Sequence, residues 1–340
     1  ITYFFRKKYP NAFSIERLFN QLADVLENRG AEIRSVELPF YNNTLGAVWR
    51  NIRWARTRVQ GSVEEQPEVV HITGDVNSII FGLRRPTVIT IHDCNPLLRY
   101  ARTHPRYWFY RWFIFEWPAR RAAAVTVISE KTRKELLELT SCRADNVHVI
   151  PNYVDPAYQP VPYSFRADYP TILHVGTTPN KNIARLAAAL EGIPCQLRIV
   201  GQPTAVDLAA LDQHAIDYTY AAGISDEAVR QHYADCDLLA FVSTYEGFGL
   251  PILEAQVTGR PVLTSNISPL KEVAGPGAAE IVDPHSVPAI RAGLLRLLQD
   301  GDHRTRLIEA GHQNAAQYRI DAVAKRYLNL YAQLSQTSQK

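Results

Sequence analysis

The sequence is short of cysteine, of long apolar runs and of the glycine motifs that mark many nucleotide-binding loops. Its four cysteines, Cys94, Cys142, Cys195 and Cys236, match no metal-ligand spacing, so we expect free thiols in a reducing cytoplasm. No run approaches the roughly 20 apolar residues of a membrane-spanning helix, and the N-terminal residues do not resemble a secretory signal. The absence of G-x-G-x-x-G weighs against a dehydrogenase, and a P-loop is absent as well.

Charge is unevenly distributed along the 340 residues. The formal net charge is +3, but residues 1–155 carry 22 Lys and Arg against 16 Asp and Glu. A basic N-terminal half favours an acidic partner such as an anionic lipid, a nucleic acid or a phosphate, and the alternative is an ordinary solvated surface. We expect no nucleic-acid partner.

Short apolar runs alternate with helical patterns in the first half of the chain. Residues 14–30 are predicted to form a helix, with Ser14 as its N-cap and Gly30 as its C-terminal stop. The predicted buried strands are residues 68–73, 87–92, 124–129 and 146–151. Strands that alternate with helices predict a parallel, doubly wound sheet.

Residues 152–170 contain four prolines and no helical period, which predicts a linker. The alternation then begins again, and about 300 residues of α/β pattern indicate two domains. In this second half we predict strands at residues 171–176, 195–201, 217–223, 237–243, 261–265 and 279–283, and helices at about 182–191, from Ser225, from Pro251, and at 286–300, 302–317 and 320–334. Ligands of doubly wound sheets bind at the carboxyl ends of the strands, so we expect both domains to face a common cleft.

The stretch "YEGFGLPILEA" (245–255) follows the predicted strand 237–243. Pro251 suits the first turn of a helix, and we expect Glu254 in that first turn. Glycines allow a close backbone approach, and a helix N-terminus favours an anion such as a diphosphate. A carboxylate can accept hydrogen bonds from ribose hydroxyls. The alternative for each residue alone is that Glu254 only complements the helix dipole and that Glu246 is solvated.

Two further segments follow predicted strands. In "HVGTTPNKN" (174–182) the backbone can hold a phosphate and Lys181 can supply a point charge, unless it is an ordinary surface lysine. In "TIHDCN" (90–95), His92 would face the same cleft, although a lone histidine at a strand end is more often structural.

These segments, in this order, resemble the retaining glycosyltransferases of family 4, which have the two-domain GT-B fold. "EGFGLPILEAQVTGRPVLTSN" resembles the family's E-x7-E motif, and "HVGTTPNKN" is similar to its phosphate loop. The resemblance implies an N-terminal acceptor-side domain at 1–155, a linker at 156–169 and a nucleotide-sugar-binding domain at 170–318. It also implies that a C-terminal helix, 319–340, packs back on the first domain.

The resemblance also implies roles for single residues. His92, Glu246 and Lys181 would take part in catalysis: His92 near the transferring sugar, Glu246 on the donor sugar and Lys181 on the diphosphate. Glu254 would hold the ribose. The donor-binding set is Gly176, Thr177, Thr178, Lys181, Glu246, Gly247, Phe248, Gly249, Leu250 and Glu254.

The chain departs from the family pattern at two places. Thr177 and Asn180 occupy positions where the family usually has an arginine, so one phosphate-binding cation is missing unless Arg185 or Arg260 replaces it. Residues 6–14 replace a glycine-rich turn. A "DCD" sequence at 235–237 imitates a metal-binding D-x-D but precedes its strand, so we expect no catalytic metal and no cofactor; the loops and Lys181 would act electrostatically instead.

The expected function is metal-independent transfer of a sugar, with retention, from a nucleotide-sugar to a glycan or lipid-linked acceptor, in cytoplasmic polysaccharide biosynthesis. The alternatives are a nucleotide-sugar 2-epimerase and a non-catalytic scaffold with the same fold. Retention admits a covalent intermediate, which needs a carboxylate beneath the anomeric carbon, or attack from the face that the leaving group occupies, which we expect here.

Residues 105–117 contain eight aromatics, and arginines flank them. Amphipathic Trp and Tyr suit a lipid headgroup layer, and a basic domain suits anionic lipid. We therefore consider residues 99–121 as a peripheral contact with the inner face of the cell membrane. The alternative is a buried helix that packs on the sheet.

Overall fold

The computed structural model describes residues 1–7, 14–41, 44–59, 69–98 and 100–337. The chain divides into two compact units. Unit 1 comprises Ile1–Tyr153 and Ile320–Lys340, and unit 2 comprises Val154–Arg319. Most of the segment that replaces the glycine-rich turn (8–13), and Arg99 of the aromatic segment, lie outside the described residues.

Unit 1 is built on a six-stranded sheet with the order β2-β1-β3-β4-β5-β6. Its strands are β1 (Thr2–Phe5), β2 (Arg34–Glu37), β3 (Val70–Ile72), β4 (Thr87–Ile91), β5 (Ala124–Val127) and β6 (Val147–Val149). Neighbouring strands pair in parallel, with register such as Val88 opposite Ala124. The parallel, doubly wound sheet predicted from the alternation is confirmed.

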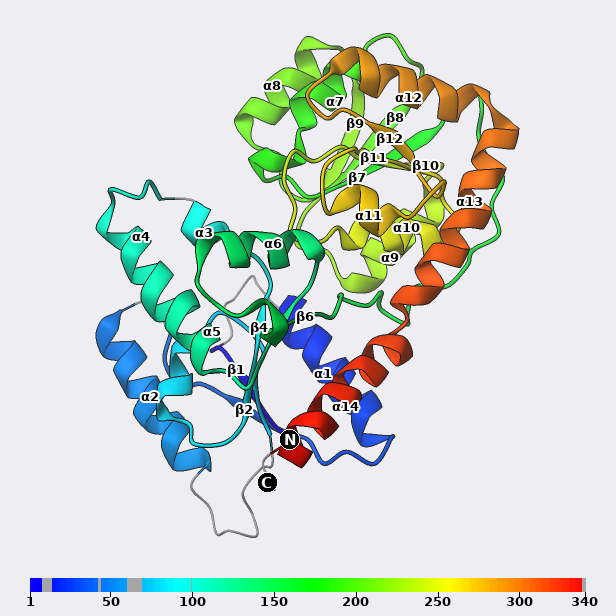
Figure 1. Ribbon diagram of the computed structural model, residues 1–340. Helices are drawn as coiled ribbons and strands as arrows, with labels where there is room; N and C mark the ends of the chain where they lie inside the picture. The colour runs from blue at the N-terminus through cyan, green and yellow to red at the C-terminus, as the bar shows by residue number, and fades with distance from the viewer. Residues whose placement is uncertain (8–13, 42–43, 60–68, 99, 338–340) are drawn as a thin grey trace. The chain divides into compact units, whose positions relative to one another are not determined.

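Helices cover both faces of this sheet (Figure 1). They are α1 (Ser14–Glu27), α2 (Leu45–Val59), η2 (Asn77–Gly82), α3 (Asn95–Leu98), α4 (Pro105–Phe109), the π-helix η3 (Tyr110–Glu116), α5 (Trp117–Arg121), α6 (Glu130–Leu139), η4 (Ala144–Asn146) and α14 (Ile320–Thr337). No helix in the described ranges has the length and apolar character to cross a membrane.

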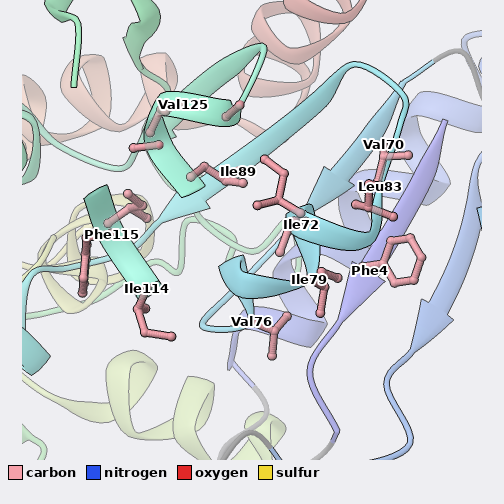
Figure 2. Packing of buried hydrophobic residues seen from close by; sticks show 14 of the residues in the cluster. Phe4, Val70, Ile72, Val76, Ile79, Leu83, Ile89, Ile114, Phe115 and Val125 are labelled. Carbon is pink, nitrogen blue, oxygen red and sulfur yellow. The ribbon is translucent and has the colours of Figure 1, made fainter. Parts of the chain in front are cut away.

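Successive side chains of β1 point to opposite faces of the unit 1 sheet and enter two different hydrophobic cores. Phe4 joins the core that η2 and η3 cover, whereas Tyr3 and Phe5 join the core beneath α1 and α14, as expected when successive strand residues point to opposite faces. Figure 2 shows Phe4 beside the η2 residue Ile79 and the strand residue Ile72. Because both faces are buried, the central strands carry apolar residues on both faces, and polar side chains within them, such as His71 and Thr90, are buried and hydrogen-bonded.

The C-terminal helix α14 is tied to the unit 1 sheet by a buried polar network. The His71 ring nitrogens lie 2.7 Å from the Tyr331 hydroxyl and 2.7 Å from the Thr90 hydroxyl, and Tyr331 also contacts the hydroxyl of Tyr3 at 3.1 Å. Burial lowers the pKa of His71 to about 3. The native ring is therefore neutral at physiological pH, and the network gives α14 a specific position on β3 and β4.

Unit 2 repeats the architecture with the order β12-β11-β10-β7-β8-β9. Its strands are β7 (Thr171–Val175), β8 (Gln196–Val200), β9 (Asp217–Ala221), β10 (Leu238–Phe241), β11 (Val262–Ser265) and β12 (Glu280–Val282). Its helices are η5 (Pro179–Lys181), α7 (Ile183–Leu190), α8 (Ala205–Gln213), α9 (Asp226–Asp235), α10 (Leu250–Thr258), α11 (Leu270–Ala274), α12 (Val287–Gln299), α13 (Gly301–Ala315) and η6 (Ala316–Tyr318).

The proline-rich segment after Tyr153 is part of unit 2 rather than a detached linker. The Tyr163 hydroxyl donates to the backbone oxygen of Asp237 (2.7 Å), and Arg166 donates to both carboxylate oxygens of Asp237 (2.9 Å each). The backbone N–H of Thr171 donates to the same carboxylate at 2.7 Å. Asp237 therefore anchors this segment at the amino end of β10. The prediction from the "DCD" sequence was that this residue precedes its strand and lies away from the site.

We predict that His71→Gln makes the stability of the protein less sensitive to acid. The unfolded His71 takes up a proton near pH 6.5, whereas the native ring does not until about pH 3, so the free energy of unfolding falls as the pH drops through this window. Lowering the pH to 5 should cost about 2 kcal/mol through this residue. Chemical unfolding at pH 7 and pH 5 measures the difference.

The control is His104→Gln, because His104 is exposed in the same unit. It should keep the full loss of stability at pH 5. His174, which is buried in unit 2 with its pKa lowered to about 4, is unchanged in both variants and cancels in the comparison. An equal acid sensitivity of the wild type and His71→Gln would show that the native ring is not held neutral.

Candidate functional site

Two loops lie side by side at the carboxyl edge of the unit 2 sheet because β7 and β10 are neighbouring parallel strands. The first loop, residues 176–182, follows β7, and the second, residues 242–249, follows β10 and leads into α10. The Thr244 N–H donates to the Asn180 oxygen at 2.8 Å, which joins the loops through their backbones. The predicted placement of both loops at one sheet edge is thus confirmed.

Lys181 is held in place from three sides. Its Nζ donates to Glu246 Oε1 at 2.6 Å, and it lies 4.4 Å from the ring centroid of Phe241 at the end of β10. Gly176 has a φ of +91°, and a Cβ there would stand 2.7 Å from Lys181 Cε. The side chains of Lys181 and Glu246 are only 16% and 14% exposed, so this ion pair is much less screened than a surface pair.

Two asparagines that the sequence patterns did not single out as site residues position these loops. Asn180 Nδ2 donates to the Tyr245 oxygen at 2.8 Å and lies 3.4 Å from Glu246 Oε1. Asn182 has a left-handed backbone (φ 66°), and its Nδ2 donates to the oxygens of Val242 (3.0 Å) and Pro284 (2.8 Å). Asparagine tolerates the left-handed region better than most residues. An asparagine directly before α7 is therefore the sequence feature that could have identified Asn182 as a loop-positioning residue.

Helix α10 begins at Leu250, directly after Gly249, whose φ is +115°. A Cβ at Gly249 would stand 2.6 Å from Leu270, so glycine is required for both conformation and space. Pro251 lies in the first turn as predicted. The prediction for Glu254 was wrong, however: the helix starts at Leu250, one residue before the predicted start at Pro251, so Glu254 is the fifth helical residue and lies in the second turn.

Glu254 is partly buried and its Oε2 accepts a hydrogen bond from the Tyr233 hydroxyl at 2.6 Å. Tyr233 is fully buried on α9, and burial together with this carboxylate raises its pKa well above the usual value. The phenol therefore remains a donor at any physiological pH and fixes the direction of the Glu254 carboxylate. Tyr233 therefore positions Glu254, a contact that its sequence context did not indicate.

The other predicted donor-binding residues lie on the same two loops. Thr178 is the N-cap of η5 in an extended conformation, and Thr177 packs on Gly201, where a Cβ would stand 2.8 Å from Thr177 Cγ2. Phe248 is buried, with its ring edge-on to Tyr318 at 5.9 Å. Gly247 precedes it in the loop after β10.

The two arginines considered as substitute cations both have hydrogen-bond partners elsewhere in unit 2. Arg260 is 1% exposed, donates to the oxygens of Val161 and Thr258 at 3.1 Å each, and stacks 4.1 Å from the ring centroid of Tyr163. Arg185 is exposed and donates to Asn182 Oδ1 at 2.9 Å. Lys181 is therefore the cation that the two loops themselves hold against a site carboxylate.

His92 lies in unit 1, directly after β4. Its Nε2–H donates to the Thr73 oxygen at 2.8 Å, and its ring is edge-on to Phe19 at 6.2 Å. Asp93 instead lines a cavity of unit 1, and its Oδ1 accepts from the Asn95 N–H at 2.8 Å. The catalytic role of His92 stays a prediction, since these contacts alone are compatible with a structural histidine.

The unit 2 loops combine a fixed cation, two carboxylates and an N-terminal helix turn whose cap makes no side-chain hydrogen bond. A cation and helix N–H groups suit an anion such as a phosphate, and carboxylates accept hydrogen bonds from hydroxyl groups. The arrangement would suit a ligand that carries both an anionic group and hydroxyl groups.

Family models match both halves of the chain. The model described as Glycosyltransferase Family 4 matches residues 10–158, and the model described as Glycosyl transferases group 1 matches residues 159–314. The second range contains both loops of the site. Together the two matches run without a gap from residue 10 to residue 314.

Individual proteins agree with these models. The O-antigen chain mannosyltransferase B of Escherichia coli is 29% identical over 233 residues, which cover 62% of this chain and 60% of that protein. Sucrose-phosphate synthase from Thermosynechococcus elongatus superposes with a TM-score of 0.80 at 18% identity, over 98% of both chains. HepE from Anabaena, in complex with UDP-glucose, gives 0.73 at 16% identity, over 98% of this chain and 99% of that one. The structures establish the GT-B fold of two doubly wound domains.

We predict that Gly176→Ala displaces Lys181 from Glu246. The new methyl group would meet Lys181 Cε at 2.7 Å, closer than any stable contact, so the lysine side chain must swing away and become more reactive. Modification of Lys181 by an amine-directed reagent, followed by mass spectrometry, should be several-fold faster than in the wild type.

The matched control is Gly192→Ala. Gly192 also has a positive φ, +71°, but nothing lies within 4 Å of an added Cβ. Both variants should lose about 1–3 kcal/mol of stability through backbone strain, and only Gly176→Ala should change the labelling of Lys181. Equal labelling rates in the two variants would contradict the packing of Lys181 on Gly176.

Proposed function

Because this chain belongs to the glycosyltransferases of family 4, we propose that it transfers a sugar from a nucleotide-sugar donor to a glycan or lipid-linked acceptor. The observation that carries the proposal is the Lys181–Glu246 contact of 2.6 Å between the two loops of unit 2. It brings together the phosphate-binding cation and the sugar-binding carboxylate that the E-x7-E resemblance implies. The complex of the structurally similar HepE with UDP-glucose supports a nucleotide-sugar as the donor.

Donor binding in this proposal exchanges the partners of the ion pair. Lys181 turns from Glu246 to the diphosphate, beside the N-terminus of α10, and Glu246 is released to accept hydrogen bonds from the sugar hydroxyls. Glu254, oriented by Tyr233, accepts from the ribose. The loops that carry these groups are already joined through their backbones, so binding requires only that the side chains of Lys181 and Glu246 change partners.

The proposed reaction is attack on the same face that the leaving group occupies. The acceptor oxygen bonds to the anomeric carbon as the bond from that carbon to the diphosphate oxygen breaks, and the departing oxygen takes the acceptor's proton. Lys181 and the α10 terminus stabilise the developing negative charge, without a catalytic metal. Glu246 acts as a binding carboxylate and not as a nucleophile, so the product keeps the donor's anomeric configuration.

We also propose that the aromatic segment of unit 1 contacts an anionic membrane at the cytoplasmic face. The continuous helix formed by α4, η3 and α5 buries Tyr107, Ile114 and Phe115. This face agrees with the alternative prediction of a helix that packs on the sheet. Its other face leaves three large aromatics exposed, namely Trp108 (43%), Phe113 (43%) and Trp117 (42%). The exposed arginines beside them are Arg102, Arg106, Arg120 and Arg121. This combination suits a headgroup layer, and the four free thiols suit a reducing compartment.

The donor assignment predicts that Lys181→Ala weakens binding of the cognate nucleotide-sugar about tenfold or more, because a hydrogen bond to a charged group contributes about 1.5–3 kcal/mol. Calorimetric titration with UDP-, GDP- and ADP-sugars first identifies the donor and then compares the variants. Arg185→Ala is the control, since it removes an exposed cation four residues away. Unchanged affinity in Lys181→Ala would refute the donor site.

The membrane proposal predicts co-sedimentation with anionic vesicles and not with neutral ones. Trp108→Ser combined with Phe113→Ser should reduce pelleting several-fold, because both aromatic side chains lose their apolar contact with the lipid. Tyr220→Ser, which removes an aromatic exposed by 46% in unit 2, should leave pelleting unchanged. Equal binding to neutral and anionic vesicles, or none to either, rejects the electrostatic contact.

A further inference from the structure

Two segments of the chain connect the units, and each carries a tyrosine that packs on the candidate donor site of unit 2. The first connection lies at residues 153–154 and the second at residues 319–320. The Val154 N–H donates to the Tyr318 oxygen at 2.9 Å, and Val154 also forms a parallel β-bridge with Arg319. The two connections are therefore joined to each other at the boundary of unit 2.

The first connection runs directly into Tyr158. The Tyr158 N–H donates to the Asp155 oxygen at 3.0 Å, and its side chain is 6% exposed. Its ring is edge-on to the ring of Tyr233, with the centroids 5.4 Å apart and an interplanar angle of 85°. Because the Tyr233 hydroxyl donates to Glu254 Oε2 at 2.6 Å, one side chain separates Tyr158 from the carboxylate that the proposed function assigns to the ribose.

The Tyr158 ring restricts the direction of this hydrogen bond. Tyr233 belongs to α9 and Glu254 to α10, and these two helices pack against each other (Figure 1). Aromatic pairs prefer an edge-to-face arrangement, and a hydrogen bond weakens steeply when its angle falls far from linear. Loss of the Tyr158 ring leaves space beside Tyr233. The phenol can then tilt, and the Glu254 carboxylate loses its fixed direction.

The second connection follows Tyr318, the last residue of η6. Its ring is edge-on to that of Phe248, with the centroids 5.9 Å apart and an interplanar angle of 70°. Phe248 is buried and directly precedes Gly249, the cap residue of α10. The backbone of residues 247–249 belongs to the predicted donor-binding set and follows the sugar-binding Glu246. The Phe248 ring therefore ties this backbone to the second connection.

We propose that Tyr158 and Tyr318 are positioning residues for the donor. Tyr158 sets the direction of the ribose carboxylate through Tyr233, and Tyr318 sets the sugar-binding loop through Phe248. The inference rests on the proposed nucleotide-sugar donor and adds that the two connections between the units complete its site. Because the two tyrosines act on different parts of the donor, their effects on binding are separable.

The role of Tyr158 is tested by calorimetry on the full chain with UDP, GDP and ADP and with the 2′,3′-dideoxy counterpart of each. For the nucleotide that the wild type binds, removal of both ribose hydroxyls should weaken binding about tenfold or more. Tyr233→Phe and Tyr158→Leu should each reduce this ribose ratio by about threefold or more. The double variant should have the same ratio as Tyr233→Phe alone, because both changes act through one hydrogen bond.

The role of Tyr318 is tested by comparing UDP-glucose, GDP-mannose and ADP-glucose with UDP, GDP and ADP. Tyr318→Leu should lower the affinity for the nucleotide-sugar relative to its nucleotide, the sugar ratio, by about threefold or more. It should leave the ribose ratio unchanged. Tyr158→Leu should do the converse and leave the sugar ratio unchanged. A purely structural role would weaken all of these ligands in proportion and would move neither ratio.

Matched variants separate positioning from loss of packing. Tyr158→Phe and Tyr318→Phe keep the rings and should restore both ratios. Tyr163→Leu removes a half-buried ring from the same proline-rich segment, where it contacts Phe165 and Arg260, and should leave both ratios unchanged. If circular dichroism shows that Tyr158→Leu is unfolded, Tyr158→Met takes its place, because methionine adapts to irregular space in a core. Wild-type ratios in the folded Tyr158 and Tyr318 variants would overturn the proposal, as would a shift of both ratios in Tyr163→Leu.

Failure of this inference can be told apart from failure of the proposed function. A wild-type protein that binds none of the nucleotides or nucleotide-sugars loses the transferase proposal and with it the roles of both tyrosines. A wild-type protein that binds them, with ratios that Tyr158→Leu and Tyr318→Leu do not change, keeps the transferase proposal. In that case only the positioning by the two connections is refuted.

Discussion

The ion pair between Lys181 and Glu246 is the interaction on which the candidate site depends. It joins the loop after β7 to the loop after β10 at 2.6 Å, and both side chains are largely shielded from water. Gly176 leaves the space that the lysine side chain needs, and the ring of Phe241 packs against the Lys181 ammonium group. The backbone bond from Thr244 to Asn180 holds the loops in the register that the pair requires. The site is therefore organised before any ligand arrives.

In this arrangement few groups are placed to stabilise the negative charge of a bound diphosphate. Arg260, which the sequence offered as a replacement for the missing family arginine, is committed to backbone oxygens and to Tyr163. Asn180 contributes a neutral amide near Glu246. A leaving diphosphate would thus be met by one lysine and the N-terminus of α10. Charge neutralisation by a shielded cation and aligned N–H groups is strong because the surroundings are less polarisable than water.

Much of the fold and of the site was predictable because the signals are local. β-branched runs such as 171–176 and 124–129 predicted strands, and glycines next to strand ends predicted the two loops. The unpredicted elements have weak signals: β2 (Arg34–Glu37) buries only Val36, and α2 contains Gly46 and four arginines. Tyr233 is recognised only through its contact with Glu254, which lies 21 residues away in the sequence. Asn182 has only the weak signal of its position before α7, and the turn of Glu254 changed because the start of α10 was predicted one residue too late.

The most direct test of this account is a crystal structure of the protein with its cognate nucleotide-sugar bound. The account predicts that Lys181 Nζ leaves Glu246 and lies within hydrogen-bond distance of the diphosphate, about 2.7–2.9 Å. It also predicts that the Glu246 carboxylate accepts hydrogen bonds from the sugar. A complex in which the Lys181–Glu246 pair remains intact and the diphosphate is bound by other residues would contradict it.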